Sequence, residues 1–80
     1  KQPHYTLTVM PANASEGARL RRHILDAAGR LPGRPNIILP HDSMEVTLSY
    51  RTRPDKTPRQ IMNQLVELLR ICEREAEERK

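Results

Sequence analysis

The stretch MEVTLSYRT, residues 44–52, has the clearest strand pattern in the chain and sets the fold class. Its apolar and polar side chains alternate, with Met44, Val46, Leu48 and Tyr50 on one face and Glu45, Thr47, Ser49 and Arg51 on the other. A period of two is typical of a strand that buries one face and exposes the other. The stretch therefore predicts a sheet whose apolar face is covered by another layer.

Two further strands are predicted upstream. Residues 4–10, HYTLTVM, alternate in the same way, which puts Leu7 on the covered face and Met10 on the exposed one. Residues 36–39 are a short apolar run between prolines, as expected for an edge strand. The turn at residues 40–43 is short enough to make this run and residues 44–52 an antiparallel hairpin.

Two helices are predicted, over residues 14–31 and from Thr57 to Glu78. Asn13 has the spacing of a cap for the first helix, which ends at the Pro- and Gly-containing sequence LPGRP. Thr57 opens the second, with proline in the first helical position and Gln60 placed for a capping box.

The order β-α-β-β-α predicts a two-layer α+β sandwich, in which a three-stranded mixed sheet carries both helices on one face. A right-handed crossover around the first helix would place the first strand parallel to the third. The arrangement resembles a ferredoxin-like fold that lacks its last strand, and it leaves the edge of the first strand open. We expect residues 1–80 to form one small domain; because position 1 is Lys and no signal peptide is visible, the chain can be a piece excised from a longer one.

The cysteine and histidine pattern excludes several function classes. A single cysteine, Cys72, cannot form an internal disulfide, and no apolar run approaches the roughly 20 residues of a membrane span. One cysteine and three scattered histidines lack zinc spacing, and three glycines form no phosphate-binding loop. We expect a cytoplasmic, reducing location, no membrane contact, no cofactor, no metal and no small-molecule substrate.

The predicted core is small, which favours a protein partner. Two tyrosines are its only aromatic residues. A chain of this size removes only about 60 to 65% of its unfolded surface from water when it folds. The last helix also has an apolar face too broad for one neighbour. We therefore predict a non-enzymatic interaction module that dimerises or binds a protein through the open sheet edge and the helix residues Met62, Val66, Leu69 and Ile71.

The charge distribution suggests an alternative function. The formal net charge is +4, and residues 1–34 hold six basic and two acidic side chains. A basic helix can bind phosphates. The candidate nucleic-acid contacts are Arg19, Arg21, Arg22, Arg30 and Arg34. Alternatively, Arg22 pairs with Asp26 on an ordinary solvated face.

A third function rests on a resemblance. His4-Tyr5-Thr6-Leu7 and His41-Asp42-Ser43-Met44 both fit His-x-Ser/Thr-apolar, which is similar to the paired motif of two-histidine phosphoesterases. The resemblance implies that His4 and His41 act as acid and base while Thr6 and Ser43 hold phosphate. A strand start and an Asp-Ser turn produce the same pattern. We prefer that interpretation and expect no catalysis.

Overall fold

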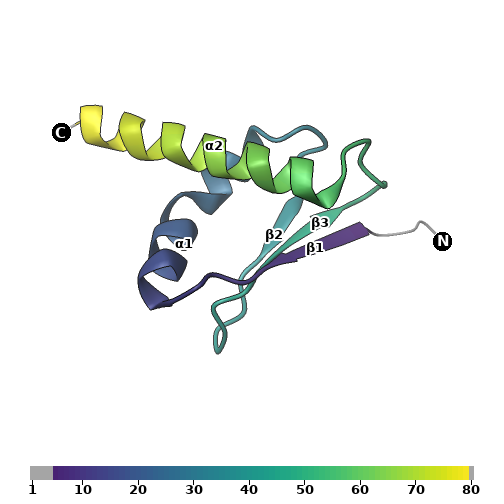
Figure 1. Cartoon of the computed structure of the whole chain (residues 1–80), viewed down its shortest axis with the longest axis horizontal. Helices are drawn as coiled ribbons and strands as arrows, with labels where there is room; N and C mark the ends of the chain where they lie inside the picture. Colours follow the sequence, from purple (N-terminus) through teal and green to yellow (C-terminus); the bar gives the residue numbers. More distant parts are fainter. Residues whose placement is uncertain (1–4, 80) are drawn as a thin grey trace.

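The computed structural model describes residues 5–79, and its elements follow the predicted order (Figure 1). They are β1 (Tyr5–Val9), α1 (Ala14–Gly29), β2 (Asn36–Ile38), β3 (Val46–Tyr50) and α2 (Pro58–Glu78). Within these residues, neither helix combines the length and the apolarity that crossing a membrane requires.

The three strands form an antiparallel sheet in the order β1-β3-β2. Leu48, in the middle of β3, lies opposite Leu7 of β1 and opposite Ile37 of β2. The prediction of a mixed sheet with the first strand parallel to the third was therefore wrong. The crossover does make β1 and β2 parallel, but β3 returns between them and runs antiparallel to both.

The core lies between the sheet and the two helices, which cover the same face. Its buried side chains come from α1 and the residues after it, from β3 and from α2: Leu20, Ile24, Ala27, Leu31, Val46, Leu48, Tyr50, Ile61, Leu65 and Cys72. Central and outer strands differ in burial. Val46 and Leu48 of β3 are 0% exposed, whereas Tyr5, Leu7 and Val9, on the same face of β1, are only half-buried. The apolar side chains of β1 are therefore less enclosed than those of β3.

The predicted caps start both helices. The Asn13 side chain accepts a hydrogen bond from the Glu16 N–H at 2.9 Å, and Thr57 and Gln60 exchange the two bonds of a capping box. α1 ends at Gly29, two residues before the predicted Leu31. Gly33 then turns the chain with a φ of +84°, and a Cβ atom there would lie 3.2 Å from the Tyr50 ring.

Candidate interaction site

A groove of about 400 Å³ lies between the end of β1, the start of α1 and the middle of α2. Its apolar lining consists of Val9, Met10, Pro11, Ala12, Leu20, Met62, Leu65, Val66 and Leu69. Four charged side chains also border it, namely Glu16, Arg19, Arg70 and Glu73. The groove is thus an apolar surface with mixed charges around it.

The groove brings together three of the four predicted interaction residues. Met62 and Leu69 are half-buried there, and Val66 is 42% exposed. Ile71 does not line the groove. It follows Leu69 by two positions, or about 200° around the helix, so it lies on another side of α2, where it is half-buried.

Sequence reasoning missed the contribution from the β1 end. Met10 was expected on the exposed face of the sheet, but it lines the groove and is 60% exposed. The alternation does not reach it because β1 ends at Val9. Pro11, which follows, marks this change of direction in the sequence.

The edge of β1 adjoins the groove, and among residues 5–79 it has no neighbouring strand, because β1 pairs there with β3 alone. Its sequence, YTLTV, contains neither proline, glycine nor a charged residue. On the face away from the helices Thr6 and Thr8 are exposed, and the Thr8 hydroxyl lies 3.3 Å from that of Thr47. Natural edge strands commonly carry charges, prolines or bulges that prevent pairing. β1 contains neither charged residues nor proline.

The opposite edge of the sheet is different. β2 has only three residues, Asn36–Ile38, and Pro35 and Pro40 lie close to its two ends. A short strand flanked by residues without an amide proton is a poor template for another strand. The two edges of the sheet are therefore unequal.

Two of the α1 arginines form ion pairs with α2. Arg19 donates two hydrogen bonds of 2.8 Å to Glu73. Arg30 donates two to Glu75, at 2.8 and 3.4 Å, and one of 3.4 Å to Asp26. The hydrogen bonds from the guanidinium groups lower the pKa of both glutamates.

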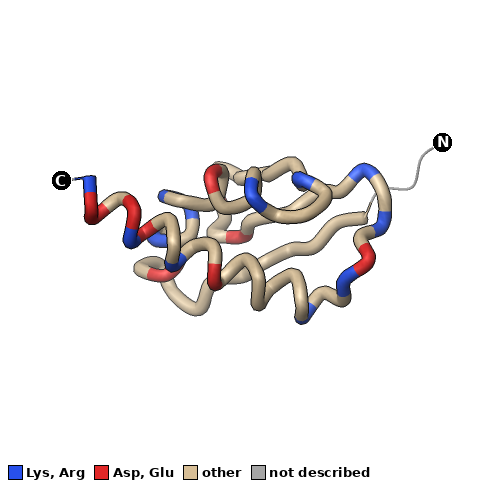
Figure 2. Tube along the Cα trace, turned by 90° about the horizontal axis from the view of Figure 1, so that it is seen from above, with Lys and Arg blue, Asp and Glu red and all other residues tan. Residues whose placement is uncertain are grey.

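Asp26 therefore pairs with Arg30, not with Arg22 as one interpretation of the sequence expected. Arg22 and Arg34 are exposed, and Arg34 has a φ of +43° in the turn after α1. In Figure 2 the basic and acidic positions are interspersed along the trace.

Arg21 has a structural contact of its own. Its guanidinium donates to the carbonyl oxygens of Ser43 at 2.6 Å and Pro40 at 3.0 Å, with a longer contact of 3.4 Å to Glu45. These carbonyls belong to the connection between β2 and β3. Three of the five candidate nucleic-acid arginines thus bind groups of the protein itself.

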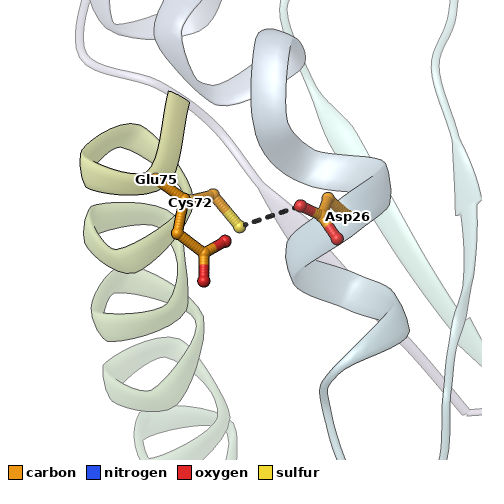
Figure 3. Close-up of side chains that lie close together, drawn as sticks. All are labelled: Asp26, Cys72 and Glu75. Atoms are coloured by element: carbon orange, nitrogen blue, oxygen red, sulfur yellow. Dashed lines mark hydrogen bonds between the residues drawn. The ribbon is translucent and has the colours of Figure 1, made fainter. Parts of the chain in front are cut away.

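Asp26, Cys72 and Glu75 form a small cluster between α1 and α2 (Figure 3). Their potential metal-ligating atoms lie within 4.8 Å of one another, and the Cys72 thiol donates to Asp26 at 3.5 Å. Cys72 is 3% exposed, and burial is the main cause that raises the pKa of its thiol. Because Arg30 already binds both carboxylates, the cluster is better explained as a link between the helices than as a cation site.

The phosphoesterase-like residues are only partly described, since His4 lies outside residues 5–79. His41 is exposed, and the Ser43 hydroxyl accepts a hydrogen bond of 3.1 Å from the Glu45 N–H, which confirms the predicted local turn. Thr6 lies opposite Ser49, whereas Ser43 precedes the other end of β3. Thr6 and Ser43 therefore do not face a common pocket.

A second hollow of about 330 Å³ lies beneath the loop between β3 and α2. Arg51, Arg53 and Lys56 border it and are exposed to solvent, together with Asp55. Its buried lining residues are Leu31, Tyr50 and Ile61, and its charged side chains are all exposed. It therefore lacks the buried charged groups that fix a ligand in a specific small-molecule site.

No protein-family model matches the chain, and no curated protein or solved structure is significantly similar to it.

Proposed function

We propose that the protein is a non-enzymatic interaction module that binds another protein chain through the β1 edge and the adjoining groove. The observation that carries this proposal is the half-burial of Tyr5, Leu7 and Val9 beside the groove. An unpaired strand edge and uncovered apolar side chains occur at the same place, and each favours association. A reducing, cytoplasmic setting suits the free thiol of Cys72.

The strand order supports a ferredoxin-like fold without its last strand. In that fold a fourth strand follows the second helix and pairs with the outer side of the first strand. That is the side of β1 left open here. A partner that covers this side would complete the usual four-stranded sheet.

The matched variants Val66→Glu and Leu25→Glu test the proposal. Val66 lines the groove and is 42% exposed, and Leu25 is 66% exposed on α1 outside the groove. Both substitutions place a new charge on an exposed helix position, so the fold should tolerate both. Circular dichroism and thermal melting verify that it does.

The binding assay uses a displayed library of random peptides, together with light scattering of the protein alone at high micromolar concentration. We expect peptide binding or self-association that Val66→Glu abolishes and Leu25→Glu leaves intact. A protein that stays monomeric and selects no peptide sensitive to Val66→Glu would refute the proposed function.

The ion pairs of Arg19 and Arg30 give no support to the nucleic-acid alternative, because they neutralise two of the cations that it requires. The exposed Arg22 and Arg34 remain as candidates for phosphate contact.

A further inference from the structure

We infer that the β1 edge and the groove accept one extended strand of a partner polypeptide, paired antiparallel to β1, and not a second copy of this chain. This inference rests on the proposed function and names the occupant of the same site.

The width of the two layers indicates the size of the missing part. Packed helices lie about 8–10 Å apart and paired strands about 4.8 Å apart, so two helices cover about four strands. The sheet has three. In Figure 2 α2 runs along the outer side of the strand that follows the grey N-terminal trace, which is β1. The helix layer therefore extends past the sheet by the width of one strand, and this space lies beneath α2 and beside β1.

The burial pattern agrees with this position. Leu48 has a strand on both sides and is 0% exposed, whereas Leu7, its partner on β1, is half-buried. One more strand beside Leu7 would give it the surroundings that Leu48 has. Strand addition at an open edge is a common mode of peptide recognition, in which alternate side chains enter pockets.

The charge and polarity of the site specify the chemistry of the partner strand. β1 is uncharged, and most of the groove lining is apolar. Among residues 5–79 no ion pair involves Glu16 or Arg70, which border the groove. The matching segment is uncharged in its centre, has apolar side chains at alternate positions toward Val66 and carries small polar ones beside Thr6 and Thr8.

The position of α2 disfavours a second copy. Antiparallel pairing of β1 with β1 of another copy would put a twofold axis just outside β1. Since α2 lies on that side, the axis would bring both α2 helices to the same place. A single strand avoids this conflict because it needs only half the width of a helix.

The experiment sequences the peptides from the displayed twelve-residue library and measures amide hydrogen exchange of the protein with and without a selected synthetic peptide. We expect selected sequences with apolar residues at every second position and slower exchange in residues 5–9. Val66→Glu and Met10→Glu should each weaken binding about tenfold or more, as buried interface contacts do. Leu25→Glu should change it less than about twofold.

Other results would overturn the inference and leave the proposed function standing. Selected peptides with apolar residues three and four positions apart, and without protection of β1, would indicate a helical partner. A dimer that protects β1 would indicate a second copy. Absence of both peptide binding and self-association would refute the inference together with the proposed function.

Discussion

Arg19 of α1 and Glu73 of α2, which are 54 residues apart in sequence, form a two-bond ion pair in which Nε and one terminal nitrogen each lie 2.8 Å from a carboxylate oxygen. Arg30 and Glu75 make a second link between the same helices. α1 and the C-terminal half of α2 are thus joined by two ion pairs, and Cys72 is buried between the two helices.

Acid should weaken this connection. The hydrogen bond from Arg19 lowers the pKa of Glu73 below its ordinary value of 4.5, and that from Arg30 does the same for Glu75. A carboxylate whose pKa is lower in the folded state than in the unfolded state stabilises the fold. This contribution is complete when the pH is above the unfolded-state pKa, and it is lost as the pH falls through the folded-state pKa. Between about pH 5 and pH 3 the melting temperature of the wild type should fall by a few degrees more than that of the E73Q/E75Q variant.

The size of this difference is limited because both pairs are accessible to solvent. It should also shrink in high salt. Equal slopes of melting temperature against pH for the two proteins would contradict the assignment.

The nucleic-acid alternative predicts a strong dependence on salt. If Arg19, Arg22 and Arg30 contacted phosphates, the log-log slope of affinity against salt would be about three. Because Arg19 and Arg30 are paired within the protein, we expect no retained complex at moderate salt. Fluorescence anisotropy with labelled DNA and RNA, at about 50 and 200 mM salt, measures this. A micromolar complex that is lost on charge reversal of Arg19 and Arg22 would establish the alternative.

Neighbouring arginines on α1 should differ in their effect on stability. Arg21→Ala removes the donor for the Ser43 and Pro40 carbonyls, and we expect a loss of about 2 kcal/mol in the free energy of unfolding. Arg22→Ala, at an exposed position, should change it by no more than about 0.5 kcal/mol. Chemical denaturation compares the two, and equal effects would show that the Arg21 contacts do not stabilise the fold.

Two glycines provide a similar contrast. Gly33→Ala places a side chain at a φ of +84° and 3.2 Å from the Tyr50 ring, so we expect a destabilisation of about 1–2 kcal/mol. Gly29→Ala, in the last turn of α1, meets no atom within 4 Å. It should be neutral or stabilising by up to about 1 kcal/mol. The reverse order in thermal unfolding would refute the proposed role of Gly33.

Local features of the fold could be predicted because their causes lie within a few residues. Thr57 and Gln60 cap α2 at three-residue spacing, and alternation identified β3. The direction of β1 relative to β3 was predicted wrongly, because the crossover makes β1 parallel to β2 and β3 then runs antiparallel to both. No local pattern indicates that β3 inserts between β1 and β2.

In the candidate site, too, some residues could be predicted from local spacing, whereas others depend on distant contacts. Helical spacing identified Met62, Val66 and Leu69, which share one side of α2. Met10 was misplaced because its position depends on where β1 ends. The partners of Arg19 and Arg30 are 54 and 45 residues away in sequence, so charge counting could not reveal that these side chains are already bound.

The inequality of the two sheet edges limits how copies of this protein can assemble. A filament built by sheet extension needs two receptive edges, so that β1 of one copy can continue onto β2 of the next. β2 is only three residues long, has prolines close to both ends and does not meet this requirement. Head-to-tail polymerisation through its own strands is therefore disfavoured, and under the proposed strand addition at β1 the extended sheet would end at β2.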